Sequence, residues 1–505
     1  MWSVIGDSIQ YTPLFFTYKD RWEIKVMYFA LKSDCYFRKY DDIGYISRPI
    51  VGMEEVVDEI GAIFLEQLEY EPKSIECLVE QLCKIFQGEN YDCIKNDAVE
   101  FYKRLSEDDF LNSSDILVTY KDEAFDYSTL KGRLAYKNLH SRNEQSSEIF
   151  LGEYSKGNPF LQNFHIELTS KCNERCIHCY IPHAQKNTDI EYDLMMNVLE
   201  QCRKMGVMTL VFSGGEPMLH PDFCKFVRRA KDLDFNVTIL SNLTVLNDEI
   251  ISSLKYRHVS CVNVSLYSME PDIHDEITTI NGSFEKTKKN ILKLIENNIA
   301  VQINCPVMKQ NKYSFHQVIN WGQDHKCSVV TDYLIMGRSD RSIDNLDNRL
   351  TKDDLKYVIE KIAENSLVFR TNLKNEGVFA EGKTSNAEAD ERVCGVALST
   401  VCMVANGDVY PCAGWQQYVC GNLREQTLES IWYDSPKIKY LRGIRLKEFE
   451  KCVGCEDYKY CLMCVSRNYN ESPNSSMFDI PQISCDGARI HHEVSDEMKR
   501  KYGLL

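Results

Sequence analysis

Three cysteines, Cys172, Cys176 and Cys179, lie close together in the run Lys-Cys-Asn-Glu-Arg-Cys-Ile-His-Cys-Tyr. The C-x-x-x-C-x-x-C spacing puts three thiolates on one tight loop, and thiolates are the usual protein ligands of iron–sulfur clusters. A four-iron cluster normally takes four cysteines, so a loop with three predicts one iron that the protein leaves open. On spacing alone, a structural zinc loop or three unrelated buried thiols are the alternatives.

This triplet resembles the cluster loop of radical S-adenosylmethionine (SAM) enzymes. The resemblance implies that the three cysteines hold a 4Fe–4S cluster and form the catalytic centre. In that family the open iron chelates the amino and carboxylate groups of SAM, and one electron cleaves SAM to a 5'-deoxyadenosyl radical that abstracts hydrogen. We therefore expect an enzyme. A non-catalytic iron–sulfur electron-transfer or scaffold protein, which needs no open iron, is the alternative from another class.

A glycine-rich turn follows the apolar run 208–212. It reads Ser-Gly-Gly-Glu-Pro at residues 213–217, and its glycines allow an approach of the backbone that a side chain would block. Taken alone, the motif also suits a simple strand-to-loop turn. In radical SAM enzymes the Gly-Gly-Glu-Pro motif contacts the methionyl amino group of SAM, and the resemblance extends that role to this turn.

Other residues stand at strand ends, or after the last cysteine, where the family binds SAM. The SAM-binding residues implied by the resemblance are Tyr180, Gly214, Gly215, Glu216, Pro217, Ser241, Asn242 and Ser265. Short polar side chains at such places also suit the cap of a turn or helix. Many family members have an arginine where this chain has Thr278, so the partner of the SAM carboxylate is left unassigned.

A second group of cysteines lies between residues 394 and 485. Cys394 and Cys412 form C-x12-G-x4-C, and after a gap five more follow, Cys452, Cys455, Cys461, Cys464 and Cys485. This order resembles the SPASM domain, although one spacing, from Cys461 to Cys464, is a residue shorter than usual. The resemblance implies two auxiliary 4Fe–4S clusters. Their implied ligands are Cys394, Cys412 and Cys464 for the first, and Cys452, Cys455, Cys461 and Cys485 for the second. A pair of zinc sites is the alternative.

Three ligands again leave one iron of the first auxiliary cluster open. Cys402 is the nearest cysteine that would close it. It lies in the apolar run 401–404 before an Asn-Gly turn, and such a position favours a packed strand residue. Cys420 receives the same interpretation.

Residues 1–115 contain no cysteine pair with ligand spacing and are predicted to form a separate α+β domain. Aromatic and β-branched runs predict strands at 22–31, 35–38 and 44–47. Ser74 is predicted to cap a helix with a continuous apolar stripe, and Asn96 to cap a second. Strands followed by short helices resemble the winged-helix-like PqqD-like domain, which implies recognition of a leader peptide by strand addition. An accessory or oligomerisation domain is the alternative.

Residues 161–385 alternate short apolar runs with helical stretches. This alternation predicts an α/β fold with a parallel sheet. The radical SAM resemblance implies a partial (β/α)6 barrel whose function lies at the C-terminal ends of its strands. Residues 116–160 are predicted as a linker, 386–495 as the SPASM domain and 496–505 as a tail.

The composition limits the partners and the compartment. The chain has 505 residues, of which 44% are hydrophobic and 27% charged, as expected of a multidomain globular protein. The net charge of -16 argues against a nucleic-acid surface. No signal-peptide layout and no apolar run of about 18 residues is found, so we expect a cytoplasmic protein without a membrane contact. In that compartment 21 cysteines indicate metal binding rather than disulfides.

The order of the three parts resembles the maturases of ribosomally synthesised peptides (RiPP maturases) of the sactipeptide and ranthipeptide type. The resemblance implies that the leader of a precursor peptide binds residues 1–115. The radical then removes a hydrogen from a core-peptide carbon, and a substrate cysteine sulfur forms a thioether there. The expected cofactors are three 4Fe–4S clusters and SAM, and the expected electron donor is flavodoxin or ferredoxin.

Other reactions remain open within the same class of enzyme. They are carbon–carbon or ether crosslinking, peptide epimerisation and sulfatase-type oxidation. Epimerisation requires a hydrogen-donating cysteine free of any cluster. The cysteines available by count are Cys202, Cys224, Cys261, Cys305 and Cys327. A thioether removes two hydrogens from the peptide, whereas epimerisation leaves its mass unchanged.

Overall fold

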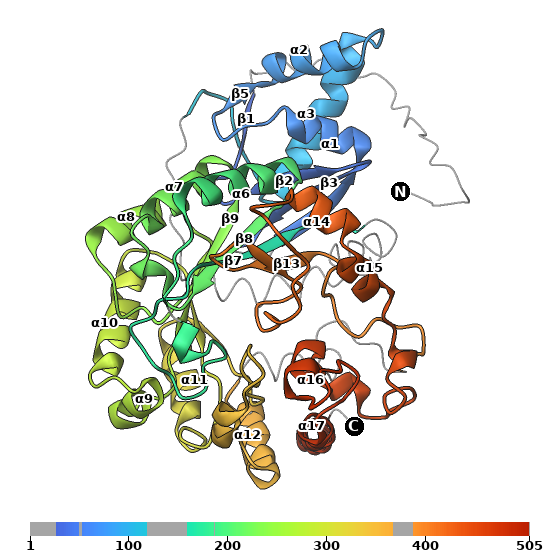
Figure 1. Cartoon of the computed structure of the whole chain (residues 1–505). Coiled ribbons are helices and arrows are strands. Elements are labelled where there is room, and N and C mark those ends of the chain that lie inside the picture. The colour runs from blue at the N-terminus through green and yellow to red at the C-terminus, as the bar shows by residue number, and fades with distance from the viewer. Residues whose placement is uncertain (1–26, 50–52, 119–158, 186, 367–386, 504–505) are drawn as a thin grey trace. The chain divides into compact units, whose positions relative to one another are not determined.

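The structure, a computed structural model, describes residues 27–49, 53–118, 159–185, 187–366 and 387–503. The described residues form two compact units. One contains the residues up to Leu31 and those from Gln67 to 118, and the other contains the described part of Lys32–Glu66 and everything described from residue 159 onward. Figure 1 shows the elements of both units.

The smaller unit pairs a short antiparallel sheet with two helices. In the sheet, β1 (Tyr28–Leu31) lies between β5 (Lys73–Ser74) and β6 (Leu111–Ser114). The helices are α2 (Ile75–Ile85) and α3 (Tyr91–Glu107). Phe29 of β1 packs on Tyr102 of α3, with ring centroids 5.3 Å apart, so the sheet and the helices share one core.

The predicted start of α2 is confirmed. The side chain of Ser74 caps the helix by accepting a hydrogen bond from the backbone N–H of Cys77 at 3.2 Å. The predicted cap at Asn96 is wrong, because that residue lies inside α3. Asn90 is the cap instead, since its side chain accepts a hydrogen bond from the backbone N–H of Asp92 at 2.8 Å.

A second antiparallel sheet belongs to the larger unit. It consists of β2 (Tyr36–Tyr40), β3 (Ile43–Arg48) and β4 (Met53–Asp58), and α1 (Glu59–Glu66) follows. Arg38 on β2 forms an ion pair with Asp234 at 3.1 Å and donates to the carbonyl of Val207 at 3.1 Å. These buried polar contacts explain why residues 32–66 group with the larger unit, whereas the sequence prediction placed all of 1–115 in one domain.

The main sheet of the larger unit has, within the described residues, nine strands in the order β12-β11-β10-β9-β8-β7-β13-β14-β15. Strands β7 to β12 are parallel. They are β7 (Asn163–Thr169), β8 (Thr209–Gly214), β9 (Asn236–Ser241), β10 (Cys261–Ser265), β11 (Val301–Asn304) and β12 (Ser328–Val330). The predicted α/β fold with a parallel sheet is confirmed.

Helices alternate with these strands and cover one face of the sheet (Figure 1). They are α6 (Tyr192–Lys204), α7 (Phe223–Asp232), α8 (Asp248–Lys255), α9 (Pro271–Thr278), α10 (Ser283–Glu296), α11 (Phe315–Asp324) and α12 (Lys352–Asn365). Short 3-10 helices are η2 (His183–Gln185), η3 (Pro217–Leu219), η4 (Asp344–Asn348), η5 (Leu446–Glu448) and η6 (Tyr458–Tyr460).

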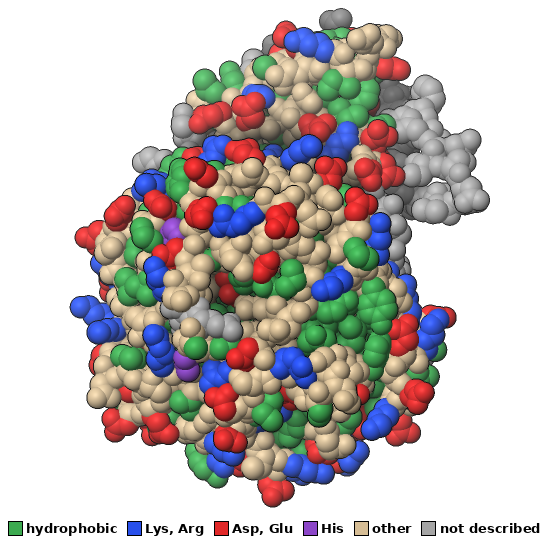
Figure 2. Space-filling model, in the orientation of Figure 1, with side chains coloured by type: hydrophobic (Ala, Val, Ile, Leu, Met, Phe, Trp, Pro, Cys, Tyr) green, Lys and Arg blue, Asp and Glu red, His purple; other side chains and the backbone are tan. Residues whose placement is uncertain are grey.

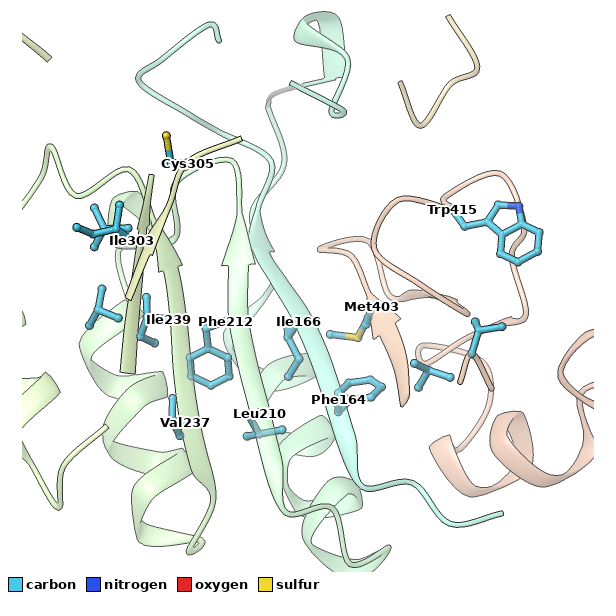
Figure 3. Close-up of a cluster of buried hydrophobic side chains, with 14 of the residues drawn as sticks. Phe164, Ile166, Leu210, Phe212, Val237, Ile239, Ile303, Cys305, Met403 and Trp415 are labelled. Atoms are coloured by element: carbon cyan, nitrogen blue, oxygen red, sulfur yellow. The ribbon is translucent and has the colours of Figure 1, made fainter. Parts of the chain in front are cut away.

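The two faces of the parallel sheet differ because successive strand residues point to opposite sides. The face under the helices is apolar and fully buried, as Phe164, Ile166, Leu210, Phe212 and Ile239 illustrate (Figure 3). The opposite, inner face carries mainly polar side chains that stay partly exposed. The hydrophobic effect therefore fixes the helices on one side and leaves the other side available to a ligand.

The C-terminal part continues the same sheet. β13 (Thr400–Met403) pairs parallel with β7, and β14 (Asp408–Tyr410) and β15 (Gly421–Asn422) follow in antiparallel order. Its helices are α14 (Leu428–Asp434), α15 (Pro436–Gly443), α16 (Val465–Glu471) and α17 (Gln482–Lys501). Because α17 runs past residue 495, the segment predicted as a tail begins inside a helix.

On the face shown in Figure 2, acidic and basic residues are interspersed. Among the residues that the structure describes, none of the helices combines the length and the hydropathy that crossing a bilayer requires.

Candidate active site

The three-cysteine loop follows β7 and is held in place by backbone hydrogen bonds. Arg175 donates to the carbonyl of Thr278 at 3.1 Å, and Ile177 donates to the carbonyl of Ile277 at 3.0 Å. Cys172, Cys176 and Cys179 are each partly exposed. The loop therefore presents its cysteines at the C-terminal end of β7, where the fold family was expected to carry out its chemistry.

The three thiols lie close enough to influence one another. Burial raises the pKa of the Cys176 thiol, and the charges of Glu174, Cys179 and Cys172 raise it further. Iron binding deprotonates thiols of this kind. Three half-buried thiolates on one loop repel one another, and bound iron ions would offset this repulsion. The three residues therefore fit the expected 4Fe–4S cofactor.

Glu174 organises the loop from inside. Its side chain is buried, and its Oε2 accepts a hydrogen bond from the Cys176 thiol at 3.3 Å. Its backbone N–H donates to the Cys172 sulfur at 3.4 Å. The sequence analysis did not assign a role to this residue, although an acidic side chain between two ligand cysteines was a visible signal.

The two glycines of the 213–217 turn make room for the cysteine loop. A Cβ on Gly214, whose φ is +135°, would meet the Thr169 carbonyl oxygen at 2.0 Å. A Cβ on Gly215 would meet the Lys171 carbonyl oxygen at 2.2 Å. Because both residues lack a Cβ, the backbone of the turn can approach the backbone of residues 169–171. The Gly215 N–H donates a hydrogen bond to the Thr169 carbonyl at 2.7 Å.

Glu216 joins the turn to the end of β9. Its carboxylate accepts hydrogen bonds from the Ser241 hydroxyl at 2.8 Å, the Asn242 backbone N–H at 2.7 Å and the Met218 backbone N–H at 3.1 Å. Burial raises the pKa of Glu216 to about 7, although these hydrogen bonds lower it. Pro217 begins η3 directly after this residue.

Asn242 links the same strand end to the cysteine loop. Its side chain donates to the Oδ1 of Asn173 at 2.9 Å and approaches the sulfur of Cys172 at 3.9 Å. The structure thus brings together Cys172, Glu216, Ser241 and Asn242. Ser265 ends β10 and is partly exposed at its C-terminal edge.

Tyr180, directly after the last cysteine of the loop, is held by a buried carboxylate. Its hydroxyl donates to Glu167 Oε1 at 2.9 Å, and the Gln416 side chain donates to the same oxygen at 3.0 Å. Burial raises the pKa of Glu167 to about 7, and the two hydrogen bonds lower it. Glu167 and Gln416 were both missed by the sequence analysis, because their contact joins segments far apart in the chain.

The cysteines expected on the first auxiliary cluster are brought together. Burial raises the pKa of Cys412 to about 12, with a further contribution from Cys464 and a smaller one from Cys394. The thiol of Cys402 is fully buried on β13, where Cys412 and Glu167 are among its charged neighbours. The structure thus places Cys402 in a buried strand position beside Cys412, and whether it packs there or binds the cluster stays a prediction.

The cysteines expected on the second auxiliary cluster come from two segments. Cys452 and Cys455 form one turn, in which the Cys455 N–H donates to the Cys452 carbonyl at 3.1 Å. Cys485 on α17 lies near Cys455, whose charge adds to the burial that raises the Cys485 pKa. Within the described ranges, no three Cys, His, Asp or Glu side chains converge at the spacing of a single metal ion.

Two family models match the chain. The radical SAM superfamily matches residues 166–322, and an iron-sulfur cluster-binding domain, SPASM, matches residues 394–457. The chain carries a radical SAM domain followed by a SPASM domain. The two domains imply 4Fe–4S clusters and SAM as cofactors.

Two curated relatives match part of the chain. The AdoMet-dependent heme synthase of Methanosarcina barkeri is 28% identical over 325 residues, which are 60% of this chain and 90% of that protein. The antilisterial bacteriocin subtilosin biosynthesis protein AlbA of Bacillus subtilis is 25% identical over 334 residues, 63% of this chain and 70% of that protein.

Solved structures extend the likeness beyond these two domains. Streptococcus suis SuiB bound to its precursor peptide SuiA has a TM-score of 0.60 at 18% identity, covering 89% of this chain and 98% of that one. The enzyme anSMEcpe with bound AdoMet has a TM-score of 0.53 at 15% identity, covering 68% of this chain and 98% of that one. The fold is therefore shared with both.

Proposed function

We propose that this protein is a peptide maturase that installs a thioether crosslink in a ribosomally synthesised precursor peptide. The observation that carries the proposal is the share of this chain that each similar protein covers. The heme synthase match covers 60% of this chain, whereas the SuiB fold covers 89% of it. SuiB was solved with a precursor peptide, and AlbA is named for the biosynthesis of a bacteriocin.

The inner face of the parallel sheet supports a neutral substrate. By the alternation of the strands, its positions are Asn163, His165, Glu167, Thr209, Val211, Ser213, Asn236, Thr238, Leu240, Cys261, Asn263, Ser265, Gln302, Asn304, Ser328 and Val330. Lysine and arginine are absent from these described positions. Amide side chains suit the donors and acceptors of a peptide backbone, whereas the carboxylates of a porphyrin call for cationic partners.

The proposed SAM site lies at the C-terminal ends of β7 to β10. When bound, the cluster and SAM supply a radical that removes hydrogen from the substrate. Glu216 fixes the ends of β8 and β9 relative to each other, and Asn242 fixes the cysteine loop against β9. Tyr180 is oriented by Glu167, so that its ring is held beside the ligand loop.

Thioether formation removes two hydrogens from the peptide. One would leave as a hydrogen atom on 5'-deoxyadenosine and the other would leave the substrate thiol as a proton. The remaining electron would need an acceptor, which an auxiliary cluster held by the C-terminal cysteines would supply. We propose that Cys394, Cys412 and Cys464 leave one iron of that cluster open for the substrate thiolate.

The N-terminal region is proposed to bind the leader of the precursor. The order of the strands β2 to β4 and the helix α1 supports this proposal. Strand addition to an exposed sheet edge is the proposed mode of binding. Because Arg38 ties β2 to Asp234, deletion of residues 1–115 would also break a buried ion pair, so a test of leader binding should leave the chain intact.

The proposal is tested with reconstituted full-length protein, SAM, a low-potential reductant and a short Cys-containing peptide encoded next to its gene. We expect a loss of two hydrogens and a fragment pattern that places a sulfur–carbon bond. A synthetic leader added in trans should inhibit this reaction and leave SAM cleavage without substrate unchanged. A peptide mass that is unchanged in ordinary water and rises in deuterated water would show epimerisation, for which Cys261 on the inner face is the candidate donor.

Heme synthesis is the second candidate, favoured by the sequence likeness to the curated relatives. It predicts that the protein binds an iron porphyrin and changes its absorption spectrum. We expect no saturable change when Fe-coproporphyrin III is titrated into the protein. A tight, stoichiometric change would overturn the peptide proposal in favour of this one.

A further inference from the structure

Four consecutive backbone carbonyls of the cysteine loop are held by one distant segment, residues 335–349. The acceptors are the carbonyls of Ile177, His178, Cys179 and Tyr180. Their donors are, in the same order, Asn348 Nδ2 at 3.3 Å, Asn345 Nδ2 at 3.3 Å, Arg338 Nη1 at 2.8 Å and the Ser339 backbone N–H at 2.8 Å. This contact fixes the half of the loop that contains Cys179.

The other side of the 335–349 segment is bound to the SPASM domain. Arg349 forms an ion pair with Glu471, and only 12% and 8% of the two side chains are exposed. The second guanidinium nitrogen of Arg349 donates to the same carboxylate at 3.0 Å. Glu471 also accepts from the Gly337 backbone N–H at 3.2 Å, and Arg341 donates to the Ser472 carbonyl at 2.7 Å.

Glu471 is connected to a cysteine of the first auxiliary cluster by a single short helix. Cys464 is the N-cap of α16, and its sulfur accepts a hydrogen bond from the Arg467 N–H at 3.5 Å. Glu471 is the last residue of the same helix. The position of Cys464 therefore sets the position of the carboxylate that binds the 335–349 segment.

A second connection reaches the same loop from another cysteine of that cluster. Gln416 lies four residues after Cys412 in the chain. Its side chain donates a hydrogen bond to the Glu167 carboxylate, which also accepts one from the Tyr180 hydroxyl. Both connections start at expected ligands of the first auxiliary cluster and end within residues 177–180.

We infer that the 335–349 segment and Glu167 position the SAM-cluster loop according to the state of the first auxiliary cluster. Glu471, Arg349 and Gln416 are the positioning residues. The inference rests on the cluster ligands of the proposed function, but not on its peptide substrate. A protein that has not assembled the first auxiliary cluster would then hold its SAM loop loosely.

The physical reason lies in the buried ion pair. A carboxylate and a guanidinium that are both withdrawn from water depend on each other, and removal of one charge leaves the other without compensation. Because Arg349 and Gly337 belong to the segment that binds the loop carbonyls, a displaced Glu471 displaces those donors as well. Energetic coupling between sites travels through such contiguous packed and hydrogen-bonded groups.

The test compares Glu471→Gln with Glu497→Gln in reconstituted full-length protein. Glu497 on α17 pairs with Lys356 on α12 at 3.3 Å, so it joins the same two domains without reaching the cysteine loop. Hydrogen exchange is measured at the amides of Ile177 and Cys179. SAM binding is followed by the change in the electron paramagnetic resonance spectrum of the reduced SAM-site cluster.

We expect Glu471→Gln to speed exchange at these two amides about tenfold and to weaken SAM binding about tenfold, with unchanged iron content. Cys464→Ser should lose the iron of one cluster and give the same exchange pattern. Glu497→Gln should behave as the wild type, and Arg349→Lys, which keeps the charge, should lie between.

Unchanged exchange and unchanged SAM binding in Glu471→Gln would overturn the inference, as would unchanged iron content in Cys464→Ser. If Glu471→Gln fails to fold, Gln416→Leu provides the same comparison through the second connection. Failure of the peptide reaction leaves these readouts intact, so the inference and the proposed function fail separately.

Discussion

The SAM-cluster loop takes its three cysteines from one short stretch of backbone, whereas the auxiliary cysteines come from several segments between residues 394 and 485. The first loop is fixed by its neighbours at the strand ends, through Gly215, Glu216 and Asn242. The auxiliary cysteines depend on a turn, on the start of α16 and on α17, which only packing brings together. The ligand set of the first loop is complete within one stretch of chain, whereas the auxiliary ligand sets are complete only when distant segments pack together.

The largest difference between the two regions is expected when one cysteine is removed from each. Cys176→Ala should abolish SAM cleavage, since it removes a ligand of the SAM cluster. Cys412→Ser should abolish peptide crosslinking while SAM cleavage continues at a reduced rate. Formation of 5'-deoxyadenosine and of crosslinked peptide, measured by chromatography and mass spectrometry, separates the two effects. SAM cleavage by Cys176→Ala would contradict the assignment of the cluster loop.

Two glycines, one in each region, test how much each region depends on close backbone packing. Gly215→Ala should destabilise the protein by about 3 kcal/mol and lower the iron content, because its Cβ would meet the Lys171 carbonyl oxygen at 2.2 Å. Gly395→Ala is the matched control, since nothing lies within 4 Å of its Cβ position next to Cys394. Iron analysis and thermal unfolding of both variants check this. Equal effects would mean that the close approach at Gly215 is not required.

Glu167 contacts residues of both regions, and its burial predicts that the free energy of unfolding depends on pH. Its pKa is raised from 4.5 to about 7 by burial, so the folded protein binds its proton more tightly than the unfolded chain. Stability should therefore fall as the pH rises from about 4.5 through about 7, with a loss of about 2 kcal/mol between pH 5 and pH 8. Glu167→Gln should reduce this slope in urea unfolding of the cluster-free protein and leave the part that Glu216 contributes, since burial raises the pKa of Glu216 to about 7 as well. An unchanged slope in this variant would show that Glu167 does not contribute to the pH dependence.

Cys402 is expected to give the smallest effect. It is buried on β13, and Cys402→Ala removes one buried sulfur at a cost of about 1 kcal/mol. The iron content should match that of the wild type, in contrast to Cys412→Ser. A loss of iron would show that Cys402 closes the first auxiliary cluster, and the proposed open site for the substrate thiolate would then be excluded.

Much of the site was predictable because its residues follow one another closely in the chain. The spacing of Cys172, Cys176 and Cys179 determines a ligand loop whatever lies around it. The turn at 213–217 was predicted to lie beside that loop, since the C-terminal ends of parallel strands meet at one edge. The family resemblance implied that this turn contacts SAM, whereas the structure shows that its glycines also allow the turn to approach the backbone at Thr169 and Lys171.

The N-terminal region was predictable in its elements and not in its grouping. Ser74 caps α2 as expected, because a cap depends on the next few residues alone. The attachment of β2 to the larger unit depends on Arg38, whose partner Asp234 is far away in the sequence. No local pattern records such a partner.

By itself, the sequence determined the ligand loop, the alternation of strands and helices and the order of the auxiliary cysteines, since each is set by spacing between near neighbours. The tertiary structure alone decided that Glu167 receives both Tyr180 and Gln416, and that Arg349 meets Glu471 behind the cysteine loop. The Glu167–Gln416 and Arg349–Glu471 contacts join residues more than a hundred positions apart. Packing of the folded chain creates them, because burial rewards a polar side chain only where a complementary partner is buried with it.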